Sequence, residues 1–206
     1  MKFTSGTIWT LLLAMAAFAA TAKAQDTEFE VMKGSETAAF HQSVGDEKCF
    51  VFSKYVVKTA QNGSEGDNIS VFARTNPANP ETACKTSGKE DHFIKDSDNN
   101  NFYGLSGRFL FIDSGTSVES RGIEIFDLSL GKSVASDLYT GDVSLADGRY
   151  LVFDSPSEKK GVISTCKEAA KWKSQGGGVG WVQGKKFDLQ TLKAVNVGTL
   201  RCVYVQ

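Results

Sequence analysis

The chain has 206 residues, with 23 basic and 24 acidic side chains and a formal net charge of −1 at pH 7. A balance so close to neutral gives no sign of the basic excess that nucleic-acid-binding proteins carry. Beyond the N-terminal segment, no stretch approaches the roughly 20 apolar residues of a membrane helix. We therefore expect neither a nucleic-acid partner nor a transmembrane segment.

The N-terminus has the pattern of a secretory signal peptide. Lys2 precedes an apolar segment at residues 8–20, and Ala22-Lys23-Ala24 is a small-x-small cleavage motif. The apolar segment is too short to cross a bilayer. We predict cleavage near Ala24, which leaves residues 25–206 as a single secreted or periplasmic domain.

Four cysteines remain after the predicted cleavage, and they are Cys49, Cys84, Cys166 and Cys202. An even number in an oxidising compartment indicates two disulfides. Sequential pairing would close two loops of similar length, because the separations are 35 and 36 positions. The other two pairings stay open. No pair has the short C-x₂₋₄-C spacing of a zinc site.

The first part of the predicted domain has two strand patterns. Residues 49–57 are aromatic and β-branched, and residues 69–74 alternate between apolar and polar positions. The turn-forming residues 61–67 between them predict a hairpin. The segment 85–101 is mostly polar, so we expect a surface loop there.

Two segments in the second half of the chain match each other. Gly107–Ser114 reads GRFLFIDS and Gly148–Ser155 reads GRYLVFDS, and the triplet Phe-Asp-Leu follows each of them, at 126–128 and 187–189. We interpret residues 102–134 and 147–195 as two repeat units of paired strands. A period near forty residues is typical of propeller blades, but the chain is too short for a closed propeller. We predict a mainly antiparallel all-β fold whose blade-like repeats form an open stack or a sandwich.

The second unit differs from the first by an insertion. Gly107 and Phe126 are 19 positions apart, whereas Gly148 and Phe187 are 39 apart. Residues 165–168 have the form of a capping box and a glycine run starts at Gly176, so we predict one short helix near 165–173.

The C-terminal part of the chain is basic. Residues 158–206 contain nine basic and three acidic residues, against 12 and 21 in residues 25–157. The two parts could complement each other within one fold, or the basic part could bind an anion. The candidate binding surface lies in and after the insertion and consists of Lys171, Trp172, Lys173, Trp181, Lys185 and Lys186. Further lysines of the insertion that could bind an anion are Lys159, Lys160 and Lys167.

The sequence shows no catalytic or metal-binding pattern. His41 and His92 lie in polar stretches, and no Gly-x-Ser-x-Gly motif accompanies them. The spacing of Asp96, Asp98 and Asn100 begins like a calcium loop, but the required glycine and closing glutamate are missing. We therefore expect no catalytic residue, cofactor or metal.

The aspartates that recur in both units allow an alternative. They are Asp113 and Asp154 at strand ends, and Asp127 and Asp188 in the Phe-Asp-Leu triplets. Two carboxylates at a defined separation would suit a glycoside hydrolase. Recurrence at the same place favours a role in each unit's own turn.

Our leading hypothesis is an exported, non-enzymatic binding or interaction protein. Its partner would be an anionic polysaccharide or an extracellular protein. A secreted hydrolase that uses Asp and Glu carboxylates is the alternative, and an inhibitor of an extracellular enzyme is a third possibility.

Overall fold

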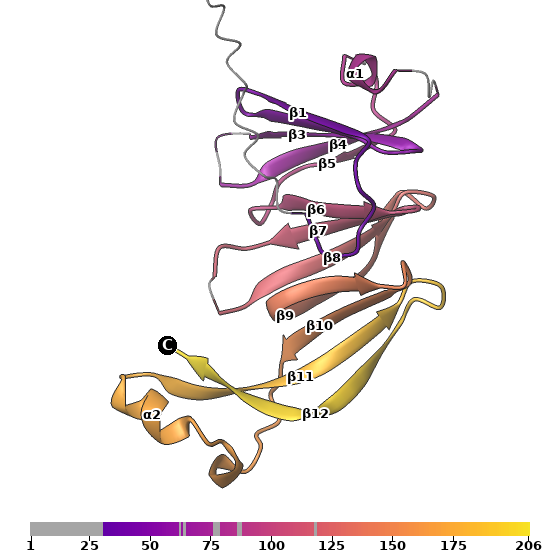
Figure 1. Cartoon of the computed structure of the whole chain (residues 1–206). Coiled ribbons are helices and arrows are strands. Elements are labelled where there is room, and N and C mark those ends of the chain that lie inside the picture. The colour runs from indigo at the N-terminus through magenta and orange to yellow at the C-terminus, as the bar shows by residue number, and fades with distance from the viewer. Residues whose placement is uncertain (1–30, 62, 64, 76–78, 86–87, 118) are drawn as a thin grey trace, which may run out of the picture.

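The computed structural model describes residues 31–206 apart from 62, 64, 76–78, 86–87 and 118, so the predicted signal peptide lies outside the described residues. The fold is mostly antiparallel β, with two sheets and two short α-helices (Figure 1). The predicted all-β class is confirmed. Each strand pairs with its neighbours in sequence, and neither sheet closes on itself.

The elements have the following bounds. The five-stranded sheet contains β1 Phe40–Val44, β2 Glu47–Val51, β3 Tyr55–Gln61, β4 Asp67–Ala73 and β5 His92–Ile94. The seven-stranded sheet contains β6 Asn101–Ser106, β7 Phe109–Ser114, β8 Arg121–Asp127, β9 Lys132–Ala146, β10 Tyr150–Pro156, β11 Gly178–Asp188 and β12 Lys193–Val205. The helices are α1 Pro80–Ala83 and α2 Ala169–Ser174, and a 3₁₀ turn, η1, spans Ile163–Thr165.

The seven-stranded sheet bends at β9, whose 15 residues pair with a different strand at each end. The first part of β9 pairs with β8, where Tyr139 lies opposite Arg121. The second part pairs with β10, where Leu145 lies opposite Leu151. Near the start of the second part, Gly141 adopts a φ of +70°, and the register with β10 shifts between Val152 and Asp154. The two halves of the sheet therefore face each other across a shared core.

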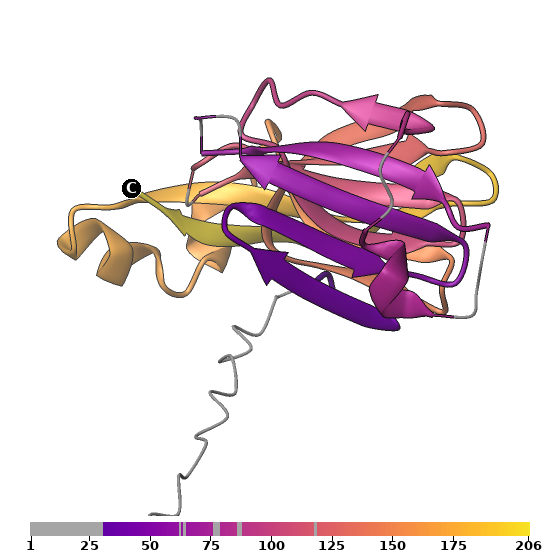
Figure 2. The ribbon, with the colours of Figure 1, turned by 90° about the horizontal axis from the view of Figure 1, so that it is seen from above.

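Strand β7 is buried on both faces and separates two cores. Phe109 and Phe111 point into the cluster between the two halves of the bent sheet. Leu110 and Ile112 point the other way and pack against the five-stranded sheet, which lies as a layer over the bent sheet (Figure 2). Burial on both faces explains why this strand has a continuous apolar sequence without polar alternation.

The strap, residues 31–39, connects the layers before β1 begins. The Met32 amide donates to the carbonyl oxygen of Tyr103 in β6, and the Leu145 amide of β9 donates to the carbonyl oxygen of Lys33. The Met32 side chain lies inside the core. Gly34 fits here because a Cβ atom would stand 2.0 Å from the carbonyl oxygen of Leu145. The strap therefore bridges the edge of β6 to the bent strand.

Two disulfides join Cys49 to Cys84 and Cys166 to Cys202, which is the sequential pairing that the spacing favours. The first joins the end of α1 to β2, and the second joins the loop before α2 to β12. Two disulfides indicate an oxidising extracellular or periplasmic compartment. Within the described part of the chain, every helix is too short or too polar to cross a bilayer.

Several local predictions are wrong. The single strand predicted for residues 49–57 is divided into β2 and β3 by a turn, in which the Phe52 amide donates to the carbonyl oxygen of Tyr55. The predicted capping box does not form, because the Thr165 hydroxyl donates to the carbonyl oxygen of Val162. The helix begins at Ala169 instead.

Strand β5 lies where a loop was expected, and the short helix α1 was not predicted. The polar segment 85–101 contains β5, which pairs with β4 at the edge of the first sheet. Helix α1 follows Asn79, whose side chain accepts a hydrogen bond from the Glu81 amide at 3.0 Å. The sequence carries this signal, because Asn is a good N-cap residue and Pro80 suits the first helical position.

Candidate binding site

The basic lobe, residues 157–177, connects β10 to β11 and projects beyond the edge of the stacked layers (Figures 1 and 2). It contains two acidic residues, Glu158 and Glu168, and five lysines. All five lysines are exposed, and they are Lys159, Lys160, Lys167, Lys171 and Lys173. The lobe therefore presents an excess of three positive charges to solvent.

Few residues of the lobe are buried, and contacts with β11 and β12 hold it in place. The Trp172 ring of α2 meets the Tyr204 ring of β12 edge-on, with 6.3 Å between the ring centroids. Gly161 lies directly against the indole of Trp181 in β11, since a Cβ atom there would be 2.3 Å from the ring. The second disulfide adds a covalent link. Both tryptophans are half-buried supports, a placement that does not favour an aromatic platform for a sugar.

Most of the lysine charge in the lobe is not neutralised. Lys171 lies 3.6 Å from the Glu168 carboxylate, and both side chains are more than half exposed, so this pair contributes little. The other four lysines of the lobe have no carboxylate within 4.0 Å among the described residues. Their charges are available to an external anion.

Two lysines of the predicted surface lie outside the lobe. As neighbours in β11, Lys185 and Lys186 point to opposite faces of the sheet. Lys185 forms an ion pair with Asp137, which also accepts a hydrogen bond from the Ser155 hydroxyl. The Lys186 ammonium lies 3.6 Å from the ring centroid of Tyr150, a cation–π contact. The structure thus groups Lys171, Trp172 and Lys173 on α2 and places the two other lysines on the sheet.

The carboxylates of the two Phe-Asp-Leu triplets bind their own turns. Asp127 Oδ1 accepts from the Ser129 amide at 2.9 Å, and Asp188 Oδ1 accepts at the same distance from the amide two residues on. Arg108 Nε lies 3.0 Å from Asp127 Oδ2, in ionic contact without the alignment of a hydrogen bond. Arg149 binds Asp188 through both carboxylate oxygens, and its hydrogen bonds hold the pKa of Asp188 well below the usual range.

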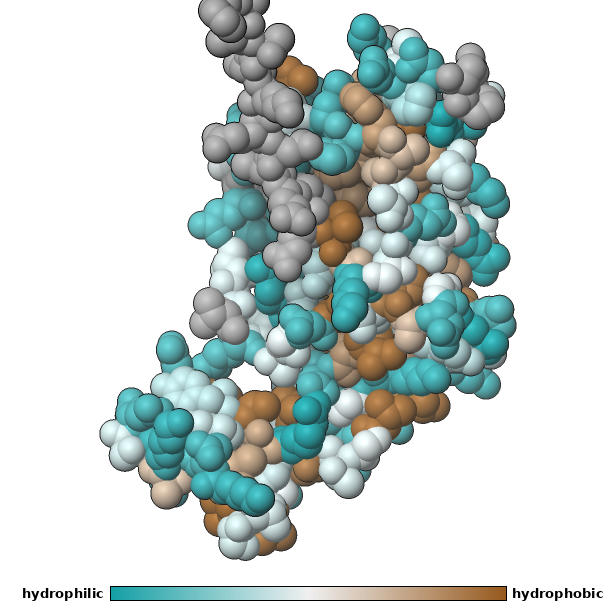
Figure 3. Space-filling model, in the orientation of Figure 1, coloured by the Kyte–Doolittle hydropathy of each residue, from teal (hydrophilic) through white to brown (hydrophobic). Residues whose placement is uncertain are grey.

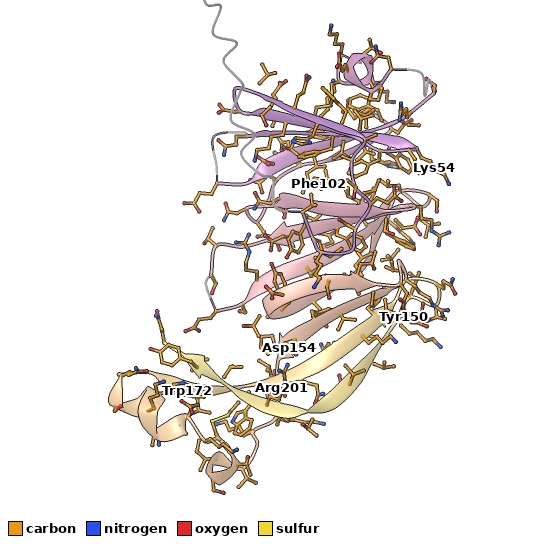
Figure 4. All side chains as sticks on the ribbon, viewed as in Figure 1. Lys54, Phe102, Tyr150, Asp154, Trp172 and Arg201 are labelled. Carbon is orange, nitrogen blue, oxygen red and sulfur yellow. A yellow bond between two sulfur atoms is a disulfide. The ribbon has the colours of Figure 1, made fainter. Side chains whose placement is uncertain are left out.

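The two aspartates predicted at strand ends lie within β7 and β10, and cationic side chains of other strands of the sheet bind them instead of their own turns. Asp113 binds Arg121 through both oxygens and accepts a hydrogen bond from the Tyr139 hydroxyl at 2.8 Å. Burial, reinforced by this hydrogen bond, raises the pKa of Tyr139. Asp154 of β10 forms an ion pair with Arg201 of β12, and Figure 4 shows these two side chains close together. The paired carboxylates are thus engaged by cationic side chains of the sheet.

A shallow depression beside Asp154 contains a second carboxylate. It has a volume of about 450 Å³ and is lined by Asp142, Asp154, Arg201 and two hydroxyl side chains, among others. It brings two carboxylates to one surface, and Arg201 forms an ion pair with the Asp154 carboxylate.

The histidines and the polar loop show no metal-binding arrangement. His92 meets the Phe126 ring edge-on at 5.7 Å, while His41 lies in the edge strand β1. Asp96 Oδ1 accepts from the Asn100 amide at 2.7 Å, so this carboxylate serves its own loop. Across the described ranges, no group of three or more His, Cys, Asp and Glu side chains is placed to hold a metal ion.

No protein-family model, no curated protein sequence and no solved structure matches the chain. The functional proposal therefore rests on the chemistry of the basic lobe and of the paired carboxylates.

Proposed function

We propose that this is an exported, non-enzymatic protein that binds an anionic partner through the basic lobe. The observation that carries the proposal is the set of four exposed lysines without a neighbouring carboxylate in the described structure. The Cys166–Cys202 disulfide and the contacts of Trp172 and Trp181 hold this charge on a fixed support. A fixed support reduces the conformational entropy lost on binding.

The hydrolase alternative has less support. Asp127 and Asp188 serve their own turns, and Asp113 and Asp154 are each bound by an arginine. Asp142 lines the same depression as Asp154 and is a candidate for a second catalytic carboxylate. An inhibitor of an extracellular enzyme would fit the same proposal, with an acidic enzyme surface as the anionic partner.

We also propose that the two matched segments are copies of one structural unit within an open stack. Support comes from the contacts that both segments make. The arginine after the turn glycine lies over the next aromatic ring, at 4.9 Å for Arg108 over Phe109 and 4.8 Å for Arg149 over Tyr150. In both segments the same arginine pairs with the aspartate of the Phe-Asp-Leu triplet.

Retention on immobilised heparin, used as an anionic polymer, tests the proposed binding function. After the predicted cleavage the chain has 21 basic and 24 acidic residues, so retention would require a local basic surface. We expect binding that weakens as salt rises, because the lysines are exposed. The test variant changes the five lobe lysines to glutamine.

The matched control changes five exposed lysines outside the lobe to glutamine, namely Lys54, Lys85, Lys89, Lys132 and Lys193. Both variants lose the same charge. We expect the lobe variant to lose retention and the control to keep most of it. Equal losses, or retention that does not respond to salt, would contradict binding through the basic lobe.

A further inference from the structure

The basic lobe has an apolar tip that its lysines alone do not explain. Val162 is 66% exposed and Ile163 is 52% exposed, and only Gly161 separates them from Lys159 and Lys160 in the loop. Lys167 follows four residues later. Figure 3 shows hydrophobic surface at the lower end of the lobe, next to hydrophilic surface. A single exposed aliphatic residue is ordinary, but two adjacent ones between lysines form an amphipathic surface.

The backbone holds these two side chains outward. In η1 the Thr165 amide and hydroxyl both donate to the Val162 carbonyl oxygen, at 2.9 and 2.7 Å. The Cys166 amide donates to the Ile163 carbonyl oxygen at 3.0 Å. This compact turn is fixed at both ends, because Gly161 packs on an indole and Cys166 is disulfide-bonded. The tip therefore has little freedom to fold back and bury its aliphatic groups.

We propose that the tip of the basic lobe, residues 159–167, docks on an anionic lipid surface. This inference rests on the proposed function and names its partner. Val162 and Ile163 enter the boundary between headgroups and acyl chains, and the three lysines of the tip contact the anionic headgroups. An anionic polysaccharide would pair with the lysines but would leave both aliphatic side chains largely in water. An anionic lipid surface would pair with the lysines and would also bury the aliphatic side chains.

The expected contributions can be scaled from known magnitudes. Each lysine near an anionic membrane contributes about 1 kcal/mol, which is roughly a fivefold change in the partition coefficient. Full burial of a valine or isoleucine contributes roughly 1.5–3 kcal/mol, so burial of the exposed part of each of these side chains contributes about 1.5 kcal/mol, which is roughly tenfold. Removal of both aliphatic groups should therefore weaken binding by roughly 100-fold. The attachment is reversible, because only two side chains insert.

Co-sedimentation of the full mature protein with lipid vesicles tests the proposal. The vesicles contain phosphatidylcholine alone, or phosphatidylcholine with about one third phosphatidylglycerol. The first variant carries Val162→Ser and Ile163→Ser, and the second carries Lys159→Gln, Lys160→Gln and Lys167→Gln. A matched control carries Leu130→Ser and Val195→Ser, because these aliphatic residues are 55% and 56% exposed outside the lobe.

We expect the wild type and the matched control to bind the anionic vesicles, the serine variant to lose roughly 100-fold, and the lysine variant to lose roughly the same amount. Circular dichroism checks that each variant is folded. Retention on heparin without vesicle binding would overturn the lipid assignment and leave the proposed function intact. Vesicle binding that is unchanged in the serine variant would overturn insertion of the tip. Binding to neither material would refute both proposals.

Discussion

Asp127 and Asp188 occupy matching positions in the two segments, yet Asp127→Ala should destabilise the protein more than Asp188→Ala. The Asp127 side chain is 0% exposed, whereas that of Asp188 is 17% exposed. Asp127 Oδ1 accepts from both the amide and the hydroxyl of Ser129. Two hydrogen bonds to a charged acceptor, at about 1.5 kcal/mol each, give a loss of about 3 kcal/mol in the free energy of unfolding. Loss of the Arg108–Asp127 ion pair adds little to this value, because the Arg108 side chain is 50% exposed.

Thermal melts followed by circular dichroism at neutral pH measure this difference. For a domain of this size, about 3 kcal/mol lowers the Tm by roughly 6–12 °C. Asp127→Asn keeps the Oδ1 acceptor and should lose about half as much. Asp188→Ala should cause a smaller fall than Asp127→Ala, because water reaches that site. If Asp188→Ala lowers the Tm as much as Asp127→Ala, burial does not determine how much these carboxylates contribute to the free energy of unfolding, and the reasoning is refuted.

Two other predictions concern acid stability and the strap. Hydrogen bonds from Arg149 lower the pKa of Asp188, so its contribution is present above the ordinary value of 3.8 and is lost as the pH falls below it. Asp188→Asn should flatten the fall of Tm with pH in that range, and an unchanged slope would contradict the assignment. Gly34→Ala places a Cβ atom 2.0 Å from a carbonyl oxygen at a φ of +83°, and should cost about 2–4 kcal/mol by urea unfolding. Gly45→Ala, at a φ of +60° with nothing within 4 Å, should cost about 1 kcal/mol, and equal losses would count against a structural role for the strap.

The sequence identified strands best where burial and pattern agree. The apolar run at Phe109–Ile112 and the turn glycines beside it predict β7 within two residues of its observed end. The break between β2 and β3 was missed because Phe52, at the turn, is 1% exposed. A buried aromatic residue in a turn continues the strand pattern, so polarity does not mark the change of direction.

The start of α2 could not be predicted from its local signals. Thr165 and Glu168 have capping-box spacing, but the disulfide at Cys166 and the η1 turn place Thr165 before the helix. Its hydroxyl then satisfies the Val162 carbonyl instead of a helical amide. Tertiary constraints override a capping motif here, because the motif contributes only about 1 kcal/mol.

The candidate site was predictable in charge but not in geometry. Composition alone located the lysines in the insertion. It could not separate Lys185 from Lys186, which share a sequence environment but point to opposite faces of β11. Val162 and Ile163 were missed because two adjacent aliphatic residues resemble a buried segment, and only the structure shows their exposure.

The construction of the basic lobe is itself an argument for a function outside the scaffold. Of its 21 residues only Cys166 and Ala169 are buried, so the lobe has almost no core of its own. It is held by a disulfide and by contacts with Trp181 and Tyr204, while the sheet beneath it is built from paired strands and internal Arg–Asp pairs. Ordering such a segment costs conformational entropy that its own burial does not offset. The projecting, braced form of the lobe, its apolar tip and its four lysines without a carboxylate partner in the described structure therefore support the proposal that a partner covers it.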